Sequence, residues 1–157
     1  MTQSDAKQAG QSNKTVLEQL LNVQVANLNV LYVKLHHFHW YVQGGSFFTL
    51  HAKFEQLYNE AAEQMDAIAE RMLALKWEPA ATLKEYLELS SIQDAAGQAE
   101  PQAMVQSLIE DLATLAESYH EAIDLADQAG DDVTGDLLTG YKRDWEKHMW
   151  MLRSYLG

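Results

Sequence analysis

Four residues of metal-ligand type stand out in this 157-residue sequence: His39, His51, Asp66 and Glu70. Imidazole nitrogens combined with carboxylate oxygens, without sulfur, suit iron, manganese or zinc. Asp66 and Glu70 are spaced i, i+4, which places both carboxylates on one face of a helix and suits a bridge between two ions. The sequence therefore contains the ligands of a metal site.

These residues cannot meet within one copy of the chain. His51 and Asp66 lie in one continuous helical pattern, and at about 1.5 Å per residue they are ~22 Å apart along it. If a two-fold axis crosses the middle of that helix, His51 of one copy faces Asp66 and Glu70 of its mate, and the contact occurs twice. His39 ends the preceding helix and joins His51 across a short loop. We expect two equal sites per dimer.

Each of these residues, taken alone, also has an ordinary explanation. An i, i+4 acidic pair such as Asp66 and Glu70 is usually a solvated helix face. His39 follows a phenylalanine and precedes Trp40, as a packed interior histidine would, and His51 can be a surface residue. Only the joint arrangement favours a metal site.

The composition restricts the class of partner. A net charge of −12, from 11 basic and 23 acidic residues, argues against nucleic acid or an anionic membrane, because both require a basic face. The absence of cysteine excludes disulfides, thiolate metal sites and a cysteine nucleophile. The sequence has no apolar run long enough to span a bilayer and no leader-like N-terminus. We expect a cytoplasmic protein.

Hydrophobic periodicity predicts an all-α fold. Residues 1–14 are polar and unpatterned, which predicts a flexible tail before a single domain at 15–157. A first helix should begin near Thr15, with apolar stripes on two faces. A second should cover about 47–75 after an N-cap at Ser46, a third should run from Pro101 to a stop at Gly130, and Asp132 should cap a fourth.

The arrangement of these helices predicts a ferritin-like four-helix bundle. Two long helices, a long crossover and two more long helices have this connectivity, and a short amphipathic piece at 83–87 predicts an extra helix in the crossover between the second and third helices. On the second helix, the candidate ligands and Glu55 lie ~60° to ~160° from the core stripe. They therefore point out of the bundle, toward a neighbour.

The segment KLHHFHWYVQGGSFFTLHAKFEQLYNEAAEQMDAIAERM (34–72) closely resembles the signature of the Dps family, the miniferritins, and the likeness continues through GDDVTGDLL (130–138) to the C-terminus. The resemblance implies a hollow dodecamer with ferroxidase sites at two-fold interfaces. Each site would bind two iron ions through His39 and His51 of one subunit and Asp66 and Glu70 of the other, with Glu55 as an accessory carboxylate. In the family, hydrogen peroxide is the preferred oxidant, and the ferric product is stored inside the shell, which protects against oxidative damage.

Asp127, Asp132 and Asp136 match the family's acidic lining of the three-fold, iron-entry pores. Asp127 lies near a helix C-terminus, where a negative charge is unfavourable by ~0.3 to 1 kcal/mol, so its presence there favours a role. An N-cap position would explain Asp132 without any pore.

The family is also known for DNA binding, but this sequence departs from the lysine-rich tail to which direct binding is attributed. The tail offers Lys7 and Lys14 against Asp5. We expect weak or absent DNA binding at physiological salt.

Two alternatives remain open from the sequence. A di-iron site inside one bundle needs two Glu-x-x-His motifs, and the segment 117–120 supplies only one. A non-enzymatic structural or adaptor bundle would use the extra apolar face of the first helix to bind another protein. The roles of His36 and His37 are also left open.

Overall fold

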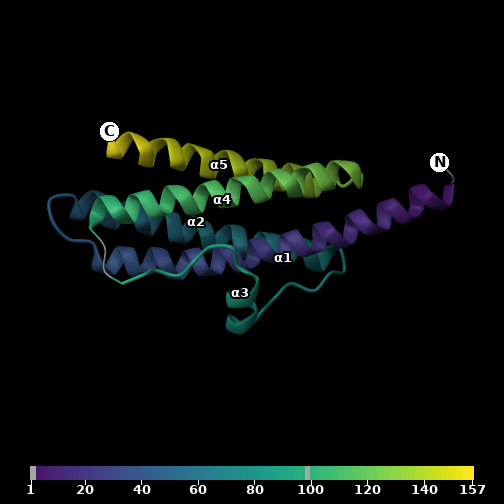
Figure 1. The fold of residues 1–157 in the computed structure, drawn as a ribbon, viewed down its shortest axis with the longest axis horizontal. Helices are drawn as coiled ribbons and strands as arrows, with labels where there is room; N and C mark the ends of the chain where they lie inside the picture. Colours follow the sequence, from purple (N-terminus) through teal and green to yellow (C-terminus); the bar gives the residue numbers. More distant parts are fainter. Residues whose placement is uncertain (1–2, 98–99) are drawn as a thin grey trace.

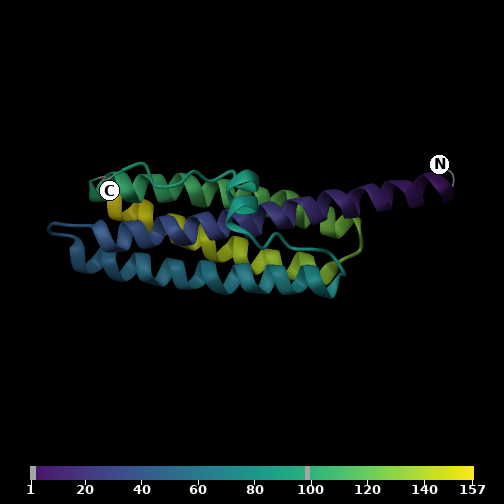
Figure 2. The ribbon, with the colours of Figure 1, turned by 90° about the horizontal axis from the view of Figure 1, so that it is seen from below.

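The computed structural model describes residues 3–97 and 100–157, with side chains from residue 12 onward. Within these ranges it contains five helices and no strand: α1 (Gln3–Tyr41), α2 (Phe47–Ala74), α3 (Leu83–Leu89), α4 (Pro101–Gln128) and α5 (Asp132–Leu156). α1 packs on α2, α4 packs on α5, and the two hairpins meet through α1 and α4 (Figures 1 and 2). The predicted all-α bundle with a short helix in its crossover is confirmed.

α1 begins earlier than the apolar pattern predicts, at Gln3 rather than near Thr15. The segment before Thr15 contains no proline and several good helix formers, so the helix continues where it has no apolar stripe. This first part of α1 projects beyond the ends of the other helices (Figures 1 and 2). Residues 1–2 of the predicted tail lie outside the described residues, and the division into tail and bundle at residue 14 stays a prediction.

The core is a single apolar cluster drawn from the four long helices. The stripe of α2 is buried at Phe54, Ala61, Ile68 and Met72. The first predicted stripe of α1 is fully buried and consists of Leu17, Leu21, Leu28, Leu31, Leu35 and Phe38. The second predicted stripe of α1 is only partly buried, because Val30 is buried whereas Val16 is 42% exposed. Burial of the aliphatic side chains, worth roughly 1.5–3 kcal/mol each, holds the helices in place.

The crossover covers the second face of α1. Asn27, fully buried in α1, accepts hydrogen bonds at Oδ1 from the Ser91 backbone (2.8 Å) and the Ser90 hydroxyl (3.0 Å). An unpaired buried amide is costly, so these bonds fix the path of the chain after α3. α3 itself begins with a capping box formed by Thr82 and Glu85.

A tight turn joins α1 to α2. Gly44 has a positive φ of 92°, a conformation that a side chain would strain, and its carbonyl accepts a hydrogen bond from Phe47 N (3.1 Å). Ser46 occupies the predicted N-cap position, but its side chain makes no capping hydrogen bond. The turn brings the end of α1 beside the start of α2.

The turn between α4 and α5 corrects one prediction. α4 starts with Pro101 and ends before Gly130 as expected, and the bonds from Gly130 N to Asp127 O and from Asp131 N to Ala126 O form a Schellman motif. The N-cap of α5 is Asp131, not Asp132, since the Asp131 side chain accepts from Thr134 N (3.1 Å). Asp132 is the first residue of the helix, so capping does not explain it.

None of the helices in the described part of the chain combines the length and the apolar character that crossing a bilayer requires.

Candidate metal centre

His39 and His51 are brought into direct contact by the α1–α2 turn. Their rings stack with centroids 3.6 Å apart and planes inclined by 15°. Each ring also bonds to the main chain of the other residue: His39 Nδ1 lies 2.8 Å from His51 O, and His51 Nδ1 lies 2.8 Å from His39 O. We call this arrangement the imidazole clip.

The clip determines which ring nitrogen is free. A carbonyl oxygen can only accept, so each Nδ1 must carry the hydrogen and donate it. In the neutral imidazole this tautomer leaves the lone pair on Nε2, the form in which imidazole binds a metal. The clip is also the usual support of a metal-bound histidine, whose other nitrogen donates to a carbonyl or carboxylate. His39 is 8% exposed, so its ring has little freedom to reorient.

The candidate carboxylates lie on the solvent side of α2. Glu55, Asp66 and Glu70 are all exposed, and Asp66 lies on the same unbroken helix as His51, ~22 Å away by helical rise. Across the described residues, no three side chains of His, Cys, Asp or Glu gather closely enough to hold a metal ion. One chain thus brings together the two imidazoles and leaves the carboxylates apart from them.

Tyr58 links the clip to the remaining histidines of the LHHFHW segment. Its ring meets His39 edge-on (5.3 Å, 87°) and stacks on His36 (3.8 Å, 19°). His36 Nδ1 donates to Tyr32 O (2.9 Å), and His37 Nε2 donates to Gly97 O in the crossover (3.1 Å). His36 thus packs beside the candidate centre, whereas His37 ties α1 to the crossover.

The predicted pore aspartates surround the α4–α5 turn. Asp127 lies in the last turn of α4, and Asp132 and Asp136 lie at the start of α5, all exposed. The turn is held from α2 by Arg71, whose guanidinium lies 2.7 Å from Asp131 Oδ1. Burial raises the pKa of Asp131, but hydrogen bonds from Thr134 and the charge of Arg71 outweigh it, so the pKa of Asp131 lies below its ordinary value.

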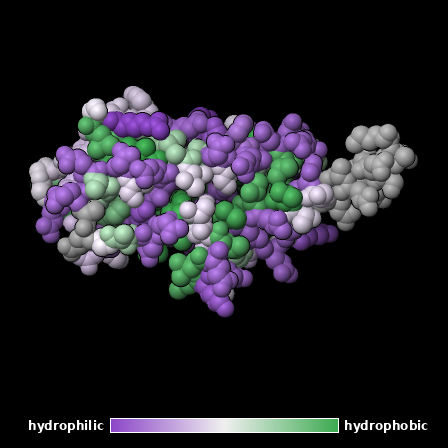
Figure 3. All heavy atoms as spheres, viewed as in Figure 1, coloured by the Kyte–Doolittle hydropathy of each residue, from purple (hydrophilic) through white to green (hydrophobic). Residues whose placement is uncertain are grey.

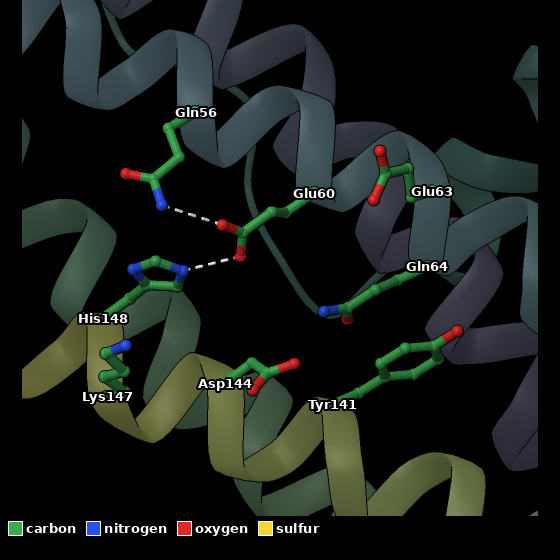
Figure 4. Close-up of a pocket in the computed structure, with 8 residues that line it drawn as sticks. All are labelled: Gln56, Glu60, Glu63, Gln64, Tyr141, Asp144, Lys147 and His148. Carbon is green, nitrogen blue, oxygen red and sulfur yellow. Dashed lines mark hydrogen bonds and ion pairs between the residues drawn. The ribbon is translucent and has the colours of Figure 1, made fainter.

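A second polar cluster lines a hollow of about 430 Å³ between α2 and α5 (Figure 4). Its members form a ring: Lys53 Nζ donates to Gln56 and to His148 Nδ1 (both 3.0 Å), Gln56 donates to Glu60 (3.0 Å), and His148 Nε2 donates to Glu60 (2.6 Å). Burial and Lys147 lower the pKa of Lys53, although Glu60 raises it. Both nitrogens of His148 are engaged, so the cluster cross-links two helices and offers no imidazole to a metal.

Comparison with known proteins decides the family. The ferritin-like domain model matches residues 18–157. General stress protein 20U of Bacillus subtilis is 53% identical over 141 residues, which covers 90% of this chain and 97% of the relative. The crystal structure of Dps from Staphylococcus aureus superposes with a TM-score of 0.88 at 46% identity, over 90% of this chain and 95% of that one. Dps from Bacillus brevis superposes with a TM-score of 0.91 at 46% identity, over 93% of this chain and 98% of that one.

The chain belongs to the Dps family. The family resemblance of residues 34–72 and 130–138 is therefore confirmed, as is the ferritin-like fold. The matches cover nearly the whole length of these Dps chains.

Sequence reasoning identified the candidate ligands of this Dps chain but missed their support. The imidazole clip depends on the conformation of the α1–α2 turn, for which residue types give no signal. The packing of Tyr58 against the clip was not predicted, although its place among the apolar positions of α2 is visible in the sequence. The pairing of Glu60 with His148 joins residues on different helices and depends on how α2 and α5 pack.

Proposed function

We propose that this Dps protein is a ferroxidase that oxidises Fe(II) and stores the ferric product as mineral inside a hollow dodecamer. The observation that carries the proposal is the imidazole clip, which commits Nδ1 of both rings to carbonyl oxygens and leaves Nε2 of each ring out of those bonds. Iron is the substrate here rather than a resident cofactor.

The stacking geometry supports two ions per site. The Nε2 lone pair lies in the plane of its ring, and the rings of His39 and His51 are nearly parallel, with centroids 3.6 Å apart. Two lone pairs in separate parallel planes cannot converge on one ion. Each imidazole therefore suits its own ion, and two neighbouring ions can supply the two electrons that reduce hydrogen peroxide.

A second subunit completes the site in this proposal. Asp66 and Glu70 face away from the bundle of their own chain, and a half-turn about the middle of α2 brings them to the clip of the mate. Glu55 serves as the accessory carboxylate. Uncovered apolar side chains on α3, Leu83 (76% exposed) and Leu87 (67%), support burial against other copies (Figure 3).

The chemistry follows from this ligand set. Two ferrous ions, one hydrogen peroxide and two protons give two ferric ions and two waters. Carboxylate oxygens are hard ligands that favour Fe(III) over Fe(II), so Asp66 and Glu70 drive the oxidation. We assign Asp127, Asp132 and Asp136 to the entry pore, because their exposed carboxylates attract cations. Consuming iron and peroxide together protects the cell from oxidative damage.

The proposal also covers the location of the protein and its binding to DNA. The net charge of −12 opposes binding to a polyanion, so we place the protein in the cytoplasm with weak or absent DNA binding. Protection of DNA then comes from removing ferrous iron and peroxide rather than from contact.

Mixed shells test whether the site is shared. His51→Ala and Asp66→Ala each disable every site in a shell made of one variant. When the two variants are co-expressed in equal amounts, each mixed dimer regains one intact site, so about a quarter of wild-type peroxide-dependent Fe(II) oxidation returns. If both halves came from one chain, mixing would restore nothing.

Size-exclusion chromatography of each shell is the control for assembly. A mixed sample that assembles but stays inactive contradicts the shared site. A wild-type protein that elutes as a monomer and leaves the rate of Fe(II) oxidation unchanged supports the adaptor bundle instead.

A further inference from the structure

We infer that Arg71 is a positioning residue for iron entry, because its guanidinium fastens the α4–α5 turn, which carries the pore aspartates, to the end of α2. The inference rests on the proposed function, in which Asp127, Asp132 and Asp136 line the entry pore. It assigns Arg71 a role in the passage of Fe(II) to the site, separate from the oxidation in which the neighbouring Glu70 takes part.

Arg71 makes two hydrogen bonds to the start of α5. It lies in the last turn of α2, where its Nε donates to Thr134 Oγ1 (2.9 Å) and its Nη2 donates to Asp131 Oδ1 (2.7 Å). The side chains of Arg71 and Asp131 are only 22% and 17% exposed, and Thr134 is fully buried. Charged hydrogen bonds of a planar guanidinium are directional, and partly buried pairs are screened little by salt. The three side chains therefore hold one arrangement.

The pore carboxylates belong to the same unit that the guanidinium holds. The Thr134 hydroxyl donates to Asp131 Oδ2 (2.5 Å), and the Asp131 amide donates to Ala126 O (2.8 Å) at the end of α4. Asp127 directly follows Ala126, and Asp132 directly follows Asp131. The backbone that carries both pore aspartates therefore moves with the turn, and the two bonds from α2 fix where the turn lies.

The position of the turn matters because entry through such a pore depends on the spacing of its carboxylates. Copies of the turn would converge on the three-fold axis, and the attraction between a carboxylate and a divalent cation falls as their separation grows. Lysine in place of Arg71 keeps the positive charge but cannot hold both partners, because a single ammonium lacks the planar fork of donors. Without the second bond the turn can shift against α2, which changes the spacing of the carboxylates.

Arg71 also has an ordinary structural explanation. A cation in the last turn of a helix interacts favourably with the helix dipole, and an ion pair between two helices can support the fold alone. That explanation predicts lower stability with normal entry. An effect through the neighbouring Glu70 would instead lower the maximal rate of oxidation.

The rate of peroxide-dependent oxidation in assembled shells, measured by stopped flow over a range of Fe(II) concentrations, separates these cases. Entry limits the rate at low Fe(II), whereas the site limits it at saturation. We expect Arg71→Lys to slow the rate at low Fe(II) roughly three- to tenfold in low salt and much less in high salt, with the maximal rate unchanged. A lower maximal rate with unchanged entry contradicts the inference.

Combination with pore variants shows whether Arg71 acts through the carboxylates. Asp127→Asn with Asp136→Asn should slow the rate at low Fe(II) roughly tenfold, and adding Arg71→Lys should slow it no further. An equal further slowing overturns the inference. Thr134→Val removes only the hydroxyl that accepts from Arg71, so it should slow entry in the same salt-dependent way.

Lys34→Met is the matched control for lost stability. It breaks the ion pair with Asp111 (2.7 Å), which lies about 24 Å from Asp127 along α4 at 1.5 Å per residue. Lys34→Met should lower Tm at least as much as Arg71→Lys does and leave the rate at low Fe(II) unchanged. If Lys34→Met slows entry as much as Arg71→Lys, lost stability explains the effect and the inference is wrong.

The pore variants also separate this inference from the proposed function. If Asp127→Asn with Asp136→Asn leaves the rate at low Fe(II) unchanged, the proposed pore is wrong and the role of Arg71 falls with it. If these variants slow entry while Arg71→Lys and Thr134→Val do not, the pore stands and only the role of Arg71 is contradicted.

Discussion

Substitutions of His51 can separate its two roles, as a metal ligand and as a donor that supports the fold. Asparagine places an amide nitrogen where the imidazole has Nδ1, so His51→Asn can keep the bond to the His39 carbonyl while losing the ligand. Glutamine places its amide near the position of Nε2, so His51→Gln loses the bond to that carbonyl. His51→Ala loses the ligand, the bond and the ring.

The expected magnitudes follow from the two contacts of the clip. The 2.8 Å hydrogen bond to His39 O is worth roughly 0.5–1.5 kcal/mol net. The stacked pair at 3.6 Å adds roughly 0.5–1.5 kcal/mol. Taking about 1 kcal/mol for each contact and about 2–4 °C per kcal/mol for a chain of this size, His51→Ala should lower Tm by ~4–8 °C and His51→Asn by only ~2–4 °C. His51→Gln should resemble the alanine variant.

The assay is thermal unfolding followed by circular dichroism, in chelator and at one protein concentration, because assembly couples stability to concentration. Cobalt(II) titration of the same samples should show that all three variants lose one ion. If His51→Asn is destabilised as much as His51→Ala, the bond to the carbonyl does not support the fold. If His51→Gln is as stable as His51→Asn, the same conclusion holds.

Three further predictions concern charged groups outside the clip. Lys34→Met leaves the buried Asp111 carboxylate without its partner at 2.7 Å, so it should lower the free energy of unfolding, measured in guanidinium, by about 3–5 kcal/mol. Lys34→Met combined with Asp111→Leu should be neutral or stabilising. Because the pKa of Asp131 is lowered, its contribution is present above pH ~4 and lost as the pH falls below that. Asp131→Asn should therefore lower Tm at neutral pH, with calorimetry showing the difference from wild type vanish in acid. Asp127→Asn with Asp136→Asn should slow Fe(II) uptake into assembled shells roughly tenfold at low salt and less at high salt, measured by stopped flow.

The helices were predictable because burial repeats along them. Of the predicted stripe on α2, Phe54, Ala61, Ile68 and Met72 are buried, whereas Tyr58 and Met65 are half-buried. Pro101 and Gly130 bound α4 as their backbone preferences require. Where no core constrains the chain, the prediction was less accurate. α1 begins at Gln3, in a segment whose sequence has no apolar stripe.

The N-cap of α5 was predicted one residue too late, at Asp132 instead of Asp131. Asp131 and Asp132 are chemically identical, and either can cap a helix. The choice depends on the Schellman turn and on Arg71, which reaches Asp131 from α2. Such a contact between distant segments leaves no trace in local sequence. Asp132 therefore has no capping role that would compete with its proposed place in the pore.

The two halves of the proposed site differ in rigidity, and the difference suits their chemistry. The imidazoles are locked by bonds to the main chain at the junction of α1 and α2, so their Nε2 atoms are placed before iron arrives. In the single chain Asp66 and Glu70 are exposed, so their side chains can shift before a neighbour covers them. Fe(II) and Fe(III) differ in radius and in preference for oxygen, so a site that oxidises its substrate and then releases it needs ligands that can move. The proposed site meets that need, because the imidazoles stay in place during turnover while the carboxylates from the neighbouring subunit move.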